Sequence, residues 1–123
     1  MTSQHFEITK VATFDAAHYL PDGPAESPYT RLHGHSFQVE ATVAGAPQPP
    51  VGWVADLAEL DQALRAVALE LDHGLLNEKP GLASPTLENL CLYFAERLSA
   101  RFPGLSRIRV SRPTIGESCA LNL

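Results

Sequence analysis

The stretch Arg31-Leu32-His33-Gly34-His35 places two histidines on either side of a single glycine. Side chains alternate between the two faces of a β-strand, so histidines two residues apart point to the same side and can bind one metal ion together. The residues that follow alternate between apolar and polar, which predicts a strand. Its apolar positions share the parity of His35 and are Phe37, Val39, Ala41 and Val43. The histidine pair is therefore expected on the apolar side of this strand.

A third histidine, His18, ends an earlier alternating segment, a strand predicted over residues 6–18. It shares the parity of the apolar positions in that segment. A lone His-x-His pair is most often a coincidence or a surface pair, and the addition of His18 favours a metal site. Three protein ligands with an open fourth position are typical of catalytic zinc, whereas structural sites close all four. We therefore predict a Zn²⁺ site formed by His18, His33 and His35, although imidazole ligands also suit iron or nickel.

Two amphipathic helices are predicted after the second strand, with Asp56 and Thr86 as their N-caps and Glu88 adding negative charge to the first turn of the second. The apolar stripe of the first helix consists of Leu57, Leu60, Leu64, Val67, Ala68 and Leu71. The apolar face of the second consists of Leu87, Leu90, Cys91, Phe94 and Leu98. Pro103-Gly104 is expected to end the second helix.

Two final strands are predicted over residues 107–112 and 117–123, joined by a turn. The order β-β-α-α-β-β predicts an α+β fold, in which a four-stranded antiparallel sheet carries two helices on one face. A chain of 123 residues is expected to form one domain, residues 1–123. Such a sheet leaves two edges, which proteins cover or pair with another chain, so a homo-oligomer is expected.

Composition argues against several classes of protein. The formal net charge of -5 disfavours nucleic-acid binding, which normally uses a basic surface. No apolar run is long enough to span a membrane, and the N-terminus lacks a signal-peptide pattern. The two cysteines, Cys91 and Cys119, do not suggest a disulfide framework. We therefore expect a cytoplasmic protein that acts on a small molecule.

Six short motifs follow one another along the chain. They are Phe14-Asp15-Ala16-Ala17-His18, Leu32-His33-Gly34-His35, Gly52-Trp53-Val54-Ala55-Asp56, Leu71-Asp72-His73, Leu76-Asn77 and Pro85-Thr86-x-Glu88-Asn89. In order and spacing they resemble the pyruvoyltetrahydropterin synthase and carboxytetrahydropterin synthase family, and the resemblance covers nearly the whole chain.

This resemblance implies the tunnelling fold, in which subunits pair sheet edges into a trimeric barrel and two trimers stack into a hexamer. It implies that His18, His33 and His35 hold zinc, which polarises the oxygens of the substrate's side chain. Active sites are implied at subunit interfaces. The bacterial branch that the chain resembles most converts 7,8-dihydroneopterin triphosphate to 6-carboxytetrahydropterin, an early step of queuosine biosynthesis.

Asp72 and His73 match the family's Asp-His pair, which contributes acid-base catalysis. A carboxylate beside an imidazole can orient the ring and raise its basicity. The alternative is a helix C-terminal pair in which His73 merely complements the helix dipole. The resemblance favours the catalytic role, and it assigns Thr86 and Glu88 to substrate binding.

The chain departs from the family four residues before His33, where a proton-moving cysteine is replaced by Tyr29. A phenol titrates near ~10 and a thiol near ~8.5, so Tyr29 is a poorer base near neutral pH. Glu26 and Asp22 lie in the same loop and are alternative replacements, as is Cys119 from elsewhere in the chain.

A second departure is Arg112-Pro113, where the family usually has Glu-Thr and uses the glutamate to anchor the pterin ring. Arg112 shares the parity of Ile108 and Val110, so it is expected to point inward, where it offers only hydrogen-bond donors. Either Glu117 takes over the anchor, or the pocket receives a different ligand, such as a carboxylate or phosphate.

Three functions fit these residues. The preferred one is a zinc-dependent lyase of the 6-carboxytetrahydropterin synthase type. The second is a divergent paralogue that keeps the fold and the zinc but acts on a different small molecule, such as an anion. The third is a non-catalytic binding or assembly protein with a structural metal, which the presence of Asp72 and His73 argues against.

Overall fold

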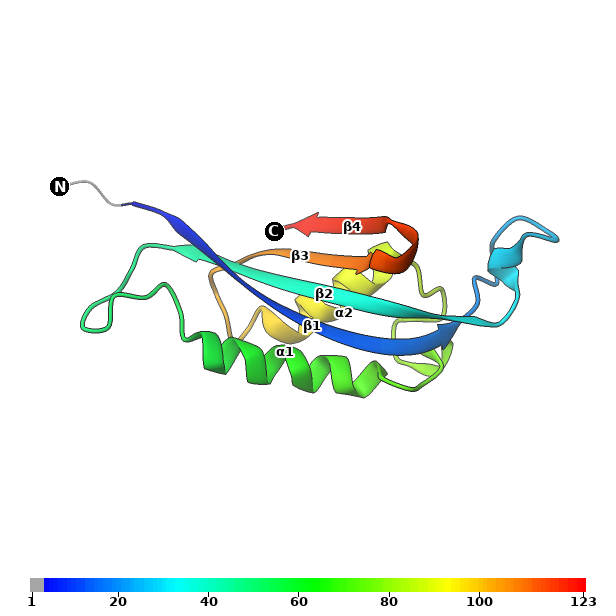
Figure 1. The fold of residues 1–123 in the computed structure, drawn as a ribbon, viewed down its shortest axis with the longest axis horizontal. Coiled ribbons are helices and arrows are strands. Elements are labelled where there is room, and N and C mark those ends of the chain that lie inside the picture. The colour runs from blue at the N-terminus through cyan, green and yellow to red at the C-terminus, as the bar shows by residue number, and fades with distance from the viewer. Residues whose placement is uncertain (1–3) are drawn as a thin grey trace.

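The computed structural model describes residues 4–123, which form one antiparallel sheet with two α-helices on one of its faces (Figure 1). The strands lie side by side in chain order, β1-β2-β3-β4. Their bounds are β1 Phe6–His18, β2 His33–Gly45, β3 Leu105–Arg112 and β4 Glu117–Asn122. The helices are α1 Leu57–Leu71 and α2 Leu87–Leu98. The predicted α+β architecture and element order are confirmed.

Both helices begin where the sequence predicts, because a side chain caps each of them. The Asp56 carboxylate accepts hydrogen bonds from the backbone N–H groups of Ala58 and Glu59. The Thr86 hydroxyl accepts one from the N–H of Asn89. Helix α1 packs mainly against β1, and α2 packs against β3 and β4. No helix within residues 4–123 is long and apolar enough to cross a membrane.

Two predictions about the helices are wrong. Helix α2 ends at Leu98 and not at Pro103, with Ser99 as its C-cap, and the turn that follows buries Phe102 against the core. Leu57 is 45% exposed, because it is the first helical residue of α1 and lies beside an open apolar cleft. The remaining residues of its stripe are buried.

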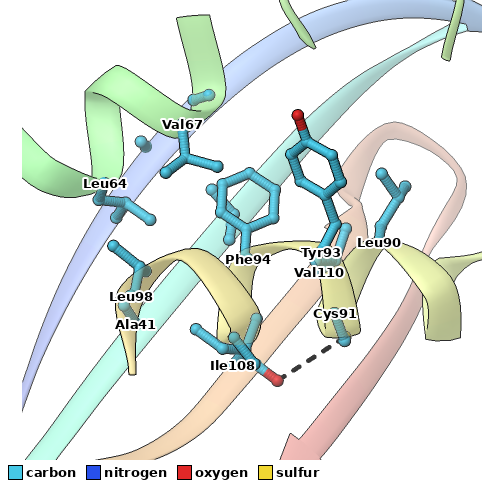
Figure 2. Packing of buried hydrophobic residues seen from close by; sticks show 14 of the residues in the cluster. Ala41, Leu64, Val67, Leu90, Cys91, Tyr93, Phe94, Leu98, Ile108 and Val110 are labelled. Atoms are coloured by element: carbon cyan, nitrogen blue, oxygen red, sulfur yellow. Dashed lines mark hydrogen bonds between the residues drawn. The ribbon is translucent and has the colours of Figure 1, made fainter. Parts of the chain in front are cut away.

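The hydrophobic core fills the space between the sheet and the helices. Phe14 of β1 stacks on Phe37 of β2 with ring centroids 5.0 Å apart, and Phe94 of α2 packs on Phe14 at 5.9 Å. Figure 2 shows Leu64 of α1 facing the same interior space as Phe94. The core therefore holds the helices against the three strands that carry most of the candidate site.

We predict that Leu64→Ala lowers the free energy of unfolding by about 2–5 kcal/mol, because Leu64 is fully buried and its truncation leaves a cavity. Leu69→Ala is a matched control on the same helix, since Leu69 is 73% exposed, and we expect a change below about 0.5 kcal/mol. Urea unfolding followed by circular dichroism measures both. Equal effects of the two substitutions would contradict the assignment of the core face.

Candidate active site

Three histidines meet at the end of the β1–β2 pair, next to the loop of residues 19–32. Figure 1 shows this loop beyond the end of the two strands. The antiparallel register pairs His18 directly with His33 and pairs Ala16 with His35. One nitrogen atom of each imidazole lies within 4.8 Å of one nitrogen atom of each of the others. Strand parity and register therefore bring the three predicted ligands together, close enough to share one metal ion.

A glycine allows the two strands to approach closely at this point. A Cβ atom on Gly34 would lie 3.3 Å from the carbonyl oxygen of Ala16, which is tighter than most contacts of this kind. Gly34 therefore contributes to the histidine cluster by permitting the backbone pairing that sets its geometry.

The hydrogen bonds of two rings fix which nitrogen is free. Nδ1 of His18 lies 3.1 Å from the carbonyl oxygen of Pro85, and Nδ1 of His33 lies 2.6 Å from that of Arg31. A carbonyl can only accept, so each Nδ1 carries the proton and each Nε2 keeps a lone pair. Nε2 of His18 is buried and has no hydrogen-bond partner among residues 4–123. A buried orphan lone pair in such a cluster fits a metal ligand.

Burial also keeps two of the rings neutral. It lowers the pKa of His18 to about 4, with the hydrogen bond to Pro85 opposing that effect. Burial and the nearby guanidinium of Arg112 lower the pKa of His35. Metal ligation needs the unprotonated imidazole, so both rings are ready to bind at neutral pH.

A cleft of about 360 Å³ opens beside His33 and His35. Its walls also include Tyr29, Arg31, Leu32, Arg112, Ile115 and Glu117. Tyr29 is 55% exposed in a single 3-10 turn, Pro28–Thr30, so the residue at the predicted cysteine position does line the cleft. Neither Glu26 nor Asp22 lines it.

Arg112 points to the helix-covered side of the sheet, as its parity predicts, and its side chain is 16% exposed. Its Nε lies 2.8 Å from a carboxylate oxygen of Glu117, the residue paired with it across β3 and β4. The Nε–H bond does not point at that oxygen, so the contact is an ion pair without a directed hydrogen bond. Arg112 stands where the family has its pterin-anchoring glutamate, and Glu117 is the alternative anchor. The two residues thus lie together in the cleft.

Asp72 and His73 occupy a different place, at the edge of β1 that faces away from β2. Asp72 accepts a hydrogen bond from the N–H of Asp15 and contacts Nδ1 of His73 at 2.8 Å. His73 adopts a left-handed backbone conformation, φ 58°, held by a bond from its N–H to the carbonyl of Asp15. His73 lines a second cavity, together with Ser36 and also His35, and it does not line the cleft of about 360 Å³. A single chain does not bring this pair into that cleft.

The pair has the electrostatics of an acid-base couple. The hydrogen bond from the Asp15 backbone, with the contact to His73, lowers the pKa of Asp72. The Asp72 carboxylate in turn raises the pKa of His73, whose ring is largely exposed. This geometry orients the imidazole and leaves its Nε2 facing outward, as a proton-transfer group requires.

The other predicted residues have structural partners. Thr86 caps α2, and Glu88 lies in the first turn of that helix. Cys119 lies against Cys91, whose thiol contacts the Cys119 carbonyl at 3.4 Å, and it does not line the cleft. Figure 2 shows Cys91 on the sheet side of α2, where it also contacts the carbonyl of Ile108. Substrate binding by Thr86 and Glu88 stays a prediction.

Sequence reasoning missed Pro85 as the residue that orients His18. The two residues are 67 positions apart, and a backbone carbonyl leaves no signature in a sequence. The motif Pro85-Thr86-x-Glu88-Asn89 was the available signal, because it marks a loop that closes on the histidines before α2 begins.

The chain is similar to several known proteins. The family model described as 6-pyruvoyl tetrahydropterin synthase matches residues 7–122. A Pyrococcus furiosus protein named dihydroneopterin monophosphate aldolase is 38% identical over 93 residues, which cover 76% of this chain and 75% of the relative. A Synechocystis protein named 6-carboxy-5,6,7,8-tetrahydropterin synthase is 38% identical over 109 residues, covering 84% and 83%.

Solved structures show the same fold. A 6-pyruvoyl tetrahydropterin synthase from Caenorhabditis elegans superposes with a TM-score of 0.84 at 21% identity, over 100% of this chain and 99% of that one. A Plasmodium vivax 6-pyruvoyltetrahydropterin synthase, studied as a variant of a catalytic glutamate, superposes with a TM-score of 0.72 at 18% identity, over 98% and 99%.

We predict that His33→Ala removes zinc, because two imidazoles cannot hold the ion against a chelator as three can. Zinc content measured by mass spectrometry after dialysis against a chelator should be stoichiometric in the unchanged protein and near zero in the variant. His5→Ala is the control, since His5 lies outside the cluster. Full zinc occupancy in His33→Ala would refute the ligand assignment.

We predict that Asp72→Asn lowers the pKa of His73. The carboxylate stabilises the protonated imidazole, so its loss lets the ring deprotonate at lower pH. NMR titration of the imidazole resonances measures the change. Asp61→Asn is the control, because that carboxylate on α1 pairs with Arg65 and Lys10. An unchanged His73 titration in Asp72→Asn would show that the pair does not interact in solution.

Proposed function

Because the chain belongs to the 6-pyruvoyl tetrahydropterin synthase family, we propose that it is a zinc-dependent lyase that breaks a bond in the side chain of a dihydropterin. The observation that carries the proposal is the cluster of His18, His33 and His35, with a buried orphan nitrogen, beside a cleft of about 360 Å³. Leu32 and Ile115 give that cleft apolar walls suited to a flat ring.

In this proposal the three histidines hold Zn²⁺, which when bound supplies Lewis-acid polarisation of the substrate's side-chain oxygens. Nδ1–H donation from His18 to Pro85 and from His33 to Arg31 fixes both rings with Nε2 available. The loop and the strand ends thereby set the position of the ligands before substrate arrives.

Proton transfer is assigned to His73, oriented by Asp72. Their position outside the cleft of their own chain supports an active site shared between copies, in which the pair of one copy serves the cleft of another. The sheet order leaves β1 and β4 as edge strands within residues 4–123, so the edges of neighbouring copies can pair. We propose the hexamer, a dimer of trimers, on this basis.

The first candidate reaction is the conversion of 7,8-dihydroneopterin triphosphate to 6-carboxytetrahydropterin in queuosine biosynthesis. The similarity to the Synechocystis synthase, over more than four-fifths of both chains, supports it. The two free cysteines are consistent with the reducing cytoplasm expected for such an enzyme.

The second candidate is aldol cleavage of a dihydroneopterin phosphate, the chemistry named for the Pyrococcus furiosus relative. Tyr29 favours it, because no cysteine among residues 4–123 lines the cleft. Cleavage between two hydroxyl-bearing carbons needs a base for one hydroxyl proton and an acid for the carbon left behind. His73 and Tyr29 are the groups that we assign to these two transfers.

The test is product analysis with zinc-loaded protein and each substrate, dihydroneopterin triphosphate and dihydroneopterin monophosphate, followed by mass spectrometry. We expect 6-carboxytetrahydropterin from the first or 6-hydroxymethyldihydropterin from the second. His73→Ala should lower the rate about 10²–10⁴-fold, the usual effect of losing an acid-base group. His5→Ala should leave the rate unchanged. Absence of both products, with zinc confirmed in place, would refute the proposal.

A further inference from the structure

Arg112 lies in the cleft with most of its hydrogen-bonding capacity unused. A guanidinium carries five N–H bonds. Its Nε lies 2.8 Å from a carboxylate oxygen of Glu117, and this buried nitrogen has no directed hydrogen-bond partner within residues 4–123. The side chain of Arg112 is 16% exposed and lines the cleft, so a ligand in the cleft can reach its guanidinium.

The charges around Arg112 favour an anion. The residues that line the cleft include one further arginine, the exposed Arg31, and one carboxylic acid, Glu117. His33 and His35 also line it, and a metal ion held by the histidines would add further positive charge. Arg112 is largely buried, so an anionic ligand that binds its guanidinium stabilises that charge.

The hydrogen-bonding groups of the candidate substrates indicate which part of the substrate Arg112 binds. The amino and ring N–H edge of a pterin consists of donors, and a guanidinium cannot accept from them. The oxygens of an ionised phosphate accept hydrogen bonds, and arginine binds a phosphate through two parallel hydrogen bonds. Both candidate substrates carry a phosphate ester on the side chain whose bond is to be broken.

We propose that Arg112 binds the phosphate of the substrate, with Glu117 holding its Nε side and Arg31 adding a second positive charge at the cleft wall. This inference rests on the proposed function for the rest of the ligand. It makes Arg112 the residue that selects phosphorylated over unphosphorylated dihydroneopterin. In this proposal the residue at the position of the family's anchoring glutamate binds the phosphate of the substrate and not the pterin ring.

The test compares the binding of dihydroneopterin monophosphate and of dihydroneopterin by titration calorimetry, in zinc-loaded and in metal-free protein. We expect Arg112→Gln to lower the affinity for dihydroneopterin monophosphate about 10- to 100-fold, because charge-assisted hydrogen bonds are lost. The affinity for dihydroneopterin should change less than about 3-fold. Arg109→Gln is the matched control, because Arg109 lies on the same strand but pairs with Glu40 and Ser118 on the other face. It should change neither affinity.

Two results would overturn the inference. Equal weakening of both ligands in Arg112→Gln would mean that Arg112 acts on the ring by positioning Glu117, and no weakening of either would mean that it binds nothing. If the unchanged protein binds neither pterin, the proposed function fails, and titration with inorganic phosphate then tests the phosphate subsite separately. Phosphate binding that Arg112→Gln abolishes supports the subsite. No phosphate binding, or binding that survives the substitution, refutes it.

Discussion

The pairing of β1 with β2 is the constraint on which the candidate site depends. Its register puts His18 opposite His33 and Ala16 opposite His35, and the close approach at Gly34 makes that register possible. The hydrophobic core enforces it four residues away from His18, because Phe14 and Phe37 are paired in the same register and stack on each other. The packing that stabilises the fold thus also sets the spacing of the ligands.

Much of this arrangement could be predicted from the sequence, because it depends on alternation. Parity alone placed the three histidines on the apolar face, and helix caps such as Asp56 marked where α1 begins. The alternation of apolar and polar residues along a strand does not predict an interaction between distant segments. The carbonyl of Pro85 on His18 and the position of His73 on the edge of β1 depend on how the loop after α1 folds back onto the sheet.

The departures at Tyr29 and Arg112 could be located in the sequence but not interpreted from it. The structure places both side chains in one cleft, and it shows that Arg112 and Glu117 form an ion pair there. Two substitutions that look independent in the chain therefore share one environment.

The β1–β2 ladder runs in unbroken register over thirteen residues of each strand. Adding or deleting one residue inside either strand would turn every later side chain to the opposite face, so a histidine would leave the cluster and a core phenylalanine would leave the core. The loop of residues 19–32 carries no such restriction. Related sequences should therefore differ in length in this loop and keep strict length along the two strands, so that the surroundings of the three histidines change while the histidines do not.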